Sequence, residues 1–138
     1  MSTPIQPAFE PDGAGYRAGA CNIGPDEIRR RRASGAVGIA GAAVLGLLLL
    51  ATDAPMLLRL VVLLPLWGGT IGLLQAQRRF CVAFAMAGVA NFGGGATTRV
   101  RVGEEAARRA DRSATVRLLR DAFLIAAAIT VAFTLLPL

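Results

Sequence analysis

The two cysteines, Cys21 and Cys81, are the side chains in this sequence best suited to chemistry. The chain has no histidine and therefore lacks the commonest metal ligand and the usual general base. Two thiols alone do not complete a zinc site, so a metal would have to be shared with Asp26 or Glu27. A redox pair, two small apolar side chains and a palmitoylated thiol are the other interpretations. We predict that Cys21 and Cys81 lie close together.

The sequence predicts no catalytic residue, no cofactor and no metal site. A Ser/His/Asp set cannot exist without histidine, and the glycine-rich stretch "FGGGATT" lacks the lysine of a Walker motif, so it is interpreted as a linker. No carboxylate falls in the central part of an apolar segment, where transporters and proton relays usually carry one. We therefore predict that the protein is not an enzyme.

A short asparagine motif occurs twice. The stretch "AGACNIG" resembles "AGVANFG", and both match Ala-Gly-x-x-Asn-x-Gly. Because asparagine and glycine both tolerate positive φ, Asn-x-Gly predicts a tight turn before a helix. The turn residues are Asn22, Gly24, Asn91 and Gly93. The two copies indicate either paired turns on one face of the protein or a chance repeat in a glycine-rich chain.

Composition indicates a membrane protein. The chain has 138 residues, of which 54% are hydrophobic and 17% charged, against about 25% charged in an ordinary soluble domain. The apolar residues concentrate at 35–51, 55–74 and 122–138, and a membrane-spanning helix needs about 20 residues. We predict an all-α integral membrane protein with three transmembrane helices, in preference to a cleaved signal peptide at the first run.

The arginines predict the orientation. All fifteen cationic residues are arginines, and all but Arg59 precede the first span or lie between the second and third. Arginine-rich segments stay in the cytoplasm, so the N-terminus and residues 75–121 are predicted inside and the C-terminus outside. Arg59 is expected to reach the opposite headgroups. The predicted setting is the bacterial inner membrane, with anionic lipid headgroups as partners and no nucleic acid; the residues nearest the lipid are Arg29, Arg30, Arg31, Arg32, Arg78 and Arg79.

Local signals divide the chain into a tail and one membrane domain. Residues 1–24 are predicted to be an irregular cytoplasmic segment, and residues 25–138 a single membrane domain. Pro25 suits a first helical turn, so the first helix should begin there and run unbroken into its span. Residues 80–92 are too short to cross and are interpreted as an interfacial or re-entrant helix, or as a cap folded under the bundle. Residues 103–121 predict a polar cytoplasmic helix, continuous with the third span and carrying Glu–Arg pairs four residues apart.

Small residues recur at every fourth position in the first and third spans. Such residues let helix backbones approach closely, which drives helix association in lipid. The predicted packing faces are Ser34, Gly38, Ala42 and Gly46 in the first span and Ala122, Ala126, Thr130 and Thr134 in the third. In the second span, Pro65 predicts a kink.

The stretches "CNIGPDEIRRRR" and "RRFCVAFAMAGVANFG" resemble an uncharacterised family of small bacterial integral membrane proteins. The resemblance implies a membrane setting and no transferable activity. From the residues we predict an accessory or scaffolding subunit of a membrane complex, or a self-assembling homo-oligomer. A small transporter or channel component, and a thiol-based redox or metal-handling protein, are the alternatives.

Overall fold

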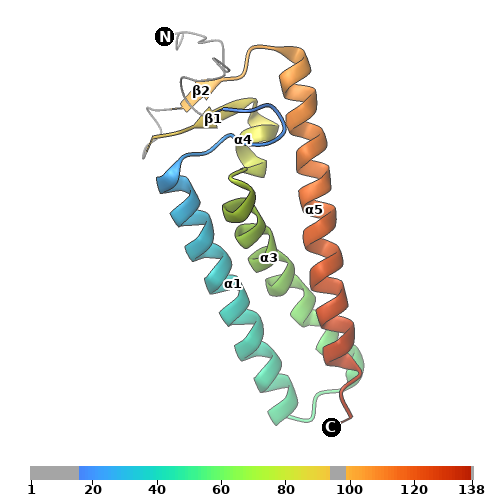
Figure 1. Ribbon diagram of the computed structural model, residues 1–138. Coiled ribbons are helices and arrows are strands. Elements are labelled where there is room, and N and C mark those ends of the chain that lie inside the picture. The colour runs from blue at the N-terminus through green and yellow to red at the C-terminus, as the bar shows by residue number, and fades with distance from the viewer. Residues whose placement is uncertain (1–15, 94–98, 138) are drawn as a thin grey trace.

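The computed structural model describes residues 16–93 and 99–137. Residues 1–15 of the predicted N-terminal tail, and most of the glycine-rich linker, lie outside these ranges. There are three long helical segments among the described residues, and α3 lies between α1 and α5 and runs antiparallel to both (Figure 1). The elements in chain order are α1 (Pro25–Ala51), α2 (Met56–Arg59), η1 (Leu60–Val62), α3 (Leu63–Arg78), α4 (Val82–Ala87), β1 (Val89–Asn91), β2 (Arg99–Arg101) and α5 (Glu105–Thr134).

Helix α1 begins and ends where the sequence predicts. Pro25 occupies the first turn, and Asp26 and Glu27 follow it, placing negative charge at the positive end of the helix dipole. The helix continues without a break through the arginines to Ala51. A single helix therefore joins the charged segment to the apolar one.

The second apolar segment is helical over residues 56–78 but changes from α-helix to 3₁₀-helix and back within its first half. Leu60–Val62 form a 3₁₀ turn between α2 and α3. Pro65 lies in the first turn of α3 and has no N–H to donate to Val61, four residues earlier. The 3₁₀ turn thus lies at the residues that Pro65 leaves without a donor, and the kink expected at Pro65 stays a prediction.

Helices α1 and α3 meet backbone to backbone at glycines. A Cβ atom on Gly38 would lie 2.6 Å from the Cα of Gly69, and one on Gly72 would lie 2.7 Å from the Cα of Gly35. Such distances leave no room for a side chain. The close approach of α1 and α3 therefore depends on the absence of side chains at these positions.

The predicted packing face of α1 needs one correction. Ser34 is exposed and donates its hydroxyl to the Arg31 carbonyl oxygen at 3.1 Å, whereas Gly35 is buried. A Cβ atom on Gly35 would lie 2.6 Å from the Leu73 nitrogen of α3, so at this level of α1 the contact is made by Gly35 and not by Ser34. Gly38 is half-buried, and Ala42 and Gly46 are buried.

Helix α5 is one continuous helix, as predicted, and it buries one side along its whole length. Ala122 and Ala126 are fully buried, and Thr130 and Thr134 are 2% and 6% exposed. The predicted pair Glu105–Arg109 forms at 3.5 Å. Glu104 lies outside the helix as its N-cap residue, in extended backbone, so Arg108 pairs with Glu105 instead, at 2.7 Å.

Two helices, Pro25–Ala51 and Met56–Arg78, are long and apolar enough to cross a membrane. The apolar half of α5 is shorter than either of these two helices. It runs from Ala122 to the end of the helix at Thr134, a length of about 20 Å at 1.5 Å per residue, against about 30 Å for the hydrocarbon core.

Residues 80–92 do not form the single short helix that was predicted. Helix α4 covers only six residues and ends at Ala87, and the residue after it, Gly88, has a φ of 70°. Strand β1 follows and pairs antiparallel with β2, with Ala90 opposite Val100. The all-α prediction is therefore incomplete, because a two-stranded sheet lies at the polar end of the bundle (Figure 1). We call residues 16–24, 79–93 and 99–104 the cap.

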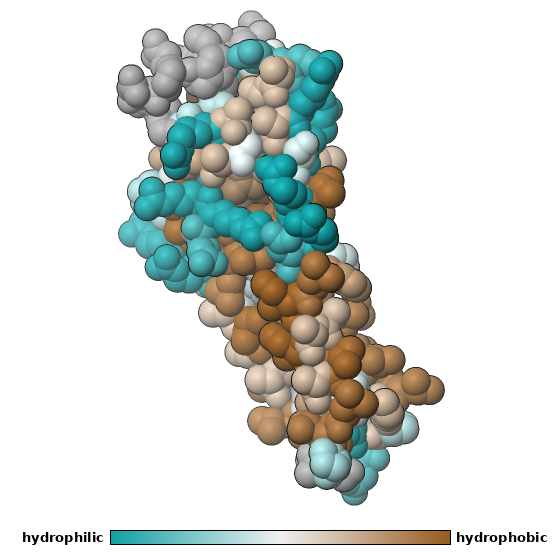
Figure 2. Space-filling model, turned by 45° about the vertical axis from the view of Figure 1, so that its right-hand side comes forward, coloured by the Kyte–Doolittle hydropathy of each residue, from teal (hydrophilic) through white to brown (hydrophobic). Residues whose placement is uncertain are grey.

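Large apolar side chains are exposed along the bundle beyond the cap. Figure 2 shows polar surface over the cap and the adjoining helix ends, and apolar surface over most of the remaining length. Leu57 is 80% exposed and Val37 72%. The other members on the same three helical segments are Val44, Leu47, Leu48, Met56, Leu58, Leu60, Val61, Leu64, Leu73, Val116, Phe123, Leu124, Ile125, Ile129 and Val131. Soluble monomers rarely expose apolar surface of this continuity.

Candidate functional site in the cap

The two asparagine motifs lie side by side and pair with each other. Ile23 and Asn91 form a parallel β-bridge. The Asn91 N–H donates to the Asn22 carbonyl oxygen at 2.9 Å, and the Gly24 N–H donates to the Asn91 carbonyl oxygen at 2.9 Å. Residues 22–24 thus run along one edge of β1, and β2 pairs with the other edge. The repeat in the sequence corresponds to two adjacent segments in space.

Asn22 joins this segment to the end of α3 through Cys81. Its Oδ1 accepts a hydrogen bond from the Cys81 N–H at 2.7 Å, and its Nδ2 donates to the Cys81 carbonyl oxygen at 3.1 Å. Both residues are fully buried. One side-chain amide therefore bonds both backbone groups of Cys81, as a neighbouring strand would, and the Cys81 carbonyl oxygen also accepts from the Ala85 N–H at 3.0 Å.

Asn91 connects β1 to the first turn of α1. Its Nδ2 donates to Oε1 of Glu27 at 3.4 Å, and Glu27 is only 4% exposed. The Glu27 carboxylate also accepts from Arg30 at 3.0 Å and from Arg31 at 3.5 Å. The buried charge is thus compensated by two guanidinium groups of its own helix.

The predicted turn conformation is wrong for the first motif. Gly24 is extended, with φ −95° and ψ −174°, and Asn22 is not among the described residues with positive φ. Gly24 is needed for a close approach, since a Cβ atom there would lie 2.4 Å from the Phe92 carbonyl oxygen. In the second motif, Asn91 Oδ1 accepts from the Gly93 N–H at 3.2 Å, which is the bond of an Asx turn.

Both cysteines are buried and free. The Cys21 thiol donates to the Ile23 carbonyl oxygen at 3.8 Å, and Cys81 contacts Asn22 through its backbone. The contact between the two cysteine-bearing segments is therefore made by Asn22, and whether the thiols approach each other stays a prediction. Among the described residues, no group of three or more His, Cys, Asp or Glu side chains could hold a metal ion.

Sequence reasoning missed the contact that fixes the N-terminal segment to α5. The Tyr16 hydroxyl donates to Oδ2 of Asp111 at 2.8 Å, and the Gly19 N–H donates to Oδ1 at 2.7 Å. Tyr16 is 1% exposed and Asp111 0%. Burial raises the pKa of Asp111, while the bonds from Gly19 and Tyr16 oppose that change. The signal available in the sequence was that Tyr16 is the chain's single tyrosine.

We expect Asp111→Ala to destabilise the cap, because the buried Tyr16 hydroxyl and Gly19 N–H would both lose their acceptor. Each unsatisfied donor costs about 1–3 kcal/mol. Asp111→Asn retains an acceptor oxygen and should cost much less. Thermal unfolding of the two variants in detergent measures the difference, and equal losses would contradict the role assigned to the carboxylate oxygens.

The same pair predicts a pH dependence. Because the pKa of Asp111 is raised in the folded protein, its stabilising contribution is complete below the unfolded pKa and is lost as the pH rises through the folded value. Asp111→Asn should lack this loss, so the difference in stability between wild type and variant should move in the variant's favour with rising pH.

The arginines of the predicted lipid-facing group have different partners. Arg29 pairs with Asp26, and Arg78 pairs with Asp121 of α5 at 2.8 Å. Arg31 and Arg99 lie 5.7 and 5.0 Å from the ring centroid of the buried Phe84, within the range of cation–π attraction. Arg32 and Arg79 are exposed, and neither has a side-chain partner in the described part of the chain.

Arg59 does not extend outward as predicted. It is 8% exposed, its Nε donates to the Ala54 carbonyl oxygen at 3.1 Å, and its Nη1 donates to the Leu136 carbonyl oxygen at 3.5 Å. These carbonyl groups follow the ends of α1 and α5, where backbone acceptors lack helical donors. Arg59 thus joins the turn after α1 to the C-terminal end of the chain.

Comparison with known proteins finds no matching family model, no matching curated protein and no matching solved structure. The resemblance carried by "CNIGPDEIRRRR" therefore stays a prediction. A functional assignment depends on the geometry of this chain alone.

Proposed function

We propose that this chain is a multi-pass protein of the bacterial inner membrane that serves as an accessory or scaffolding subunit, or assembles with itself. The observation that carries the proposal is the continuous apolar surface on three helical segments next to a compact polar cap (Figure 2). In water this surface would drive aggregation, whereas in lipid it is the expected exterior.

The proposed orientation places the cap in the cytoplasm. The cap adjoins the start of α1, the end of α3 and the arginine-rich half of α5 (Figure 1), and arginine-rich segments remain on that side. The apolar half of α5 is proposed as a third crossing. Because it measures only about 20 Å, it requires the residues after Thr134, a thinner bilayer or the neighbouring helices to complete the span.

The cap supports a scaffolding role more than a catalytic one. The buried side chain of Asn22 in the cap, and those of Glu27 in α1 and Asp111 in α5 next to it, are each bonded to other segments of the same chain. These hydrogen bonds hold the cap together and fix it to the helices. Such a network fixes a surface in one shape. A fixed cytoplasmic surface on a membrane bundle is suited to binding another subunit.

Topology tests the membrane setting. Reporter fusions after Ala33, Asp53, Gly95 and Leu138 should read inside, outside, inside and outside, because the arginines hold the cap in the cytoplasm. The protein should also stay with membranes during alkaline carbonate washing. Release into the wash, or both chain ends inside, would contradict three crossings.

Native mass spectrometry of the detergent-extracted protein tests the scaffolding role. The expected result is a homo-oligomer or a defined complex with another membrane subunit. A strictly monomeric species at all protein concentrations, with no co-purifying subunit, would contradict this role while leaving the membrane setting intact.

A further inference from the structure

A cavity of about 640 Å³ opens between the N-terminal segment, the start of α1 and the end of α3. Three arginines line it, each from a different segment: Arg17, Arg29 and Arg79. Its walls include Ile23, Ile28 and Phe92. Cationic groups and an apolar wall thus share one space, which neither the cap network nor the helix packing uses.

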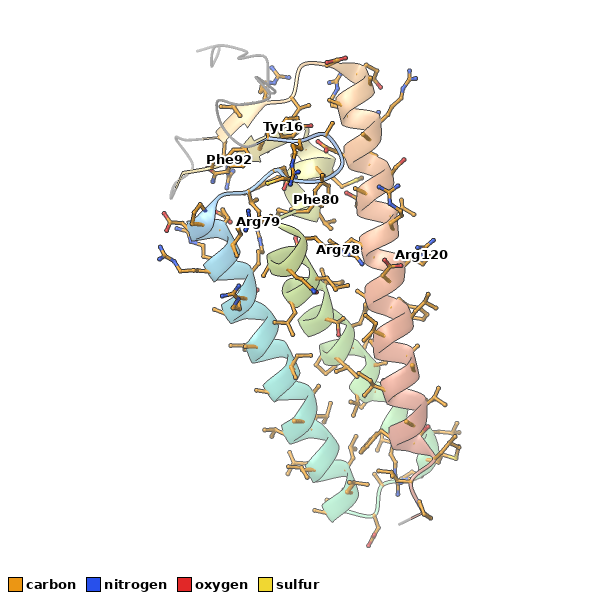
Figure 3. The ribbon with its side chains drawn as sticks, in the orientation of Figure 1. Tyr16, Arg78, Arg79, Phe80, Phe92 and Arg120 are labelled. Atoms are coloured by element: carbon orange, nitrogen blue, oxygen red, sulfur yellow. The ribbon has the colours of Figure 1, made fainter. Side chains whose placement is uncertain are left out.

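Arg79 reaches this cavity because α3 ends in a left-handed residue. Its φ of 54° and ψ of 41° turn the chain away from the helix axis. Figure 3 shows Arg79 beside the beginning of α1, and Phe92 lies above it, next to the end of β1. The Arg79 carbonyl oxygen accepts from the Asn22 N–H at 3.1 Å, so its backbone is held next to residues 21–24.

Two of the three arginines that line the cavity have no acidic partner among the described residues. Arg29 pairs with Asp26, whereas Arg17 and Arg79 have no side-chain partner in the described part of the chain. Both are exposed. Two uncompensated guanidinium groups on one cavity favour an anion, and arginine is well suited to phosphate because its planar donors fit phosphate oxygens.

We propose that this cavity binds the phosphate headgroup of an anionic membrane lipid. The proposal rests on the membrane orientation given above, which puts the start of α1 and the end of α3 at the cytoplasmic headgroup level. Arg17 and Arg79 bind the phosphate, and the half-buried Ile28 and Phe92 contact the apolar part of the molecule. A free phosphate would gain nothing from these apolar walls, which is why a lipid is the favoured source.

The test compares lipids on the wild-type protein first. Purified protein in a neutral detergent is titrated with phosphatidylglycerol, phosphatidylcholine or inorganic phosphate, and bound lipid is counted by native mass spectrometry. We expect phosphatidylglycerol to bind at least about tenfold more tightly than phosphatidylcholine, since only the former has a net negative charge. Equal binding of the two lipids would overturn the proposal, and so would equally tight binding of inorganic phosphate.

A matched set of charge variants locates the site. Arg17→Gln and Arg79→Gln each remove one charge from the cavity, and Arg32→Gln removes one exposed charge that does not line it. The double variant Arg17→Gln/Arg79→Gln should lose about tenfold or more of its affinity for phosphatidylglycerol, and Arg32→Gln less than about threefold. Equal losses would show general attraction of arginines to anionic lipid and contradict a defined site.

Two parallel measurements keep the outcomes distinct. Slow alkylation of the buried Cys81 reports that each variant retains its cap, so a loss of lipid binding in a folded variant is a loss at the cavity. Carbonate washing of the wild type tests the membrane setting separately. A protein embedded in the membrane without preference for phosphatidylglycerol would refute the lipid site and leave the proposed function standing.

Discussion

Gly38→Ala should destabilise the bundle, whereas Gly41→Ala should not. The two substitutions add the same methyl group three residues apart on α1. At Gly38 the new Cβ would lie 2.6 Å from the Gly69 Cα and 2.8 Å from its nitrogen, while at Gly41 it would meet nothing within 4 Å. Backbone atoms cannot move aside as a flexible side chain can, so α1 and α3 must separate.

The expected loss for Gly38→Ala is about 1–3 kcal/mol, the usual cost of overpacking. Gly41→Ala should be neutral or stabilise by up to about 1 kcal/mol, because alanine favours a helix interior more than glycine does. A second matched pair lies on α3, where Gly69→Ala would place its Cβ 2.7 Å from the Ile39 nitrogen and Gly68→Ala meets nothing within 4 Å.

Thermal unfolding in detergent, followed by loss of the monodisperse species, measures both pairs. The result that would refute the contact between α1 and α3 is a similar midpoint for Gly38→Ala and Gly41→Ala. The two pairs should agree, since Gly38 and Gly69 meet each other.

Asn22→Ala should open the cap at Cys81. The variant removes the acceptor at 2.7 Å and the donor at 3.1 Å that serve the Cys81 backbone. The buried Cys81 N–H is left without an acceptor, while the Cys81 carbonyl oxygen keeps the Ala85 N–H at 3.0 Å. Since an unsatisfied buried group costs about 1–3 kcal/mol, we expect local opening to become at least about fivefold more frequent.

Alkylation of Cys81 by N-ethylmaleimide, located by peptide mass spectrometry, reports this opening directly. Cys81 is 0% exposed, so labelling of the wild type should be slow and should accelerate in Asn22→Ala. Gln77→Ala, an exposed substitution near the end of α3, is the control and should leave the rate unchanged. Unaltered protection of Cys81 in Asn22→Ala would mean that the amide does not hold this segment.

Asn22→Asp gives an intermediate case. Aspartate keeps an oxygen for the Cys81 N–H but has no donor for the Cys81 carbonyl group, and it brings a negative charge into a fully buried position. Labelling should therefore be faster than in the wild type, and more so at neutral than at low pH, because protonation restores a neutral side chain that carries a donor.

The sequence by itself determined the features that depend on neighbouring residues. Pro25 and the two acids after it predicted where α1 begins, and the uninterrupted helix formers after Glu105 predicted that α5 is continuous. The burial of Ala122, Ala126, Thr130 and Thr134 followed from their spacing. Each of these depends on local backbone preference or on the period of a helix, and both can be read within a few turns of chain.

Tertiary structure alone decided which distant groups meet. The motif around Asn22 predicted a turn, yet the residue bonds to Cys81 and runs beside Asn91, far along the chain. In the sequence Asp111 is one acid in a polar helix, and only the fold shows that Tyr16 and Gly19 donate hydrogen bonds to its carboxylate. Arg59 was predicted to reach the lipid headgroups, because its acceptor at Leu136 lies at the other end of the sequence. These partners are chosen by the packing of α1, α3 and α5, which brings unsatisfied backbone and polar groups from separate segments together, and no local pattern encodes that choice.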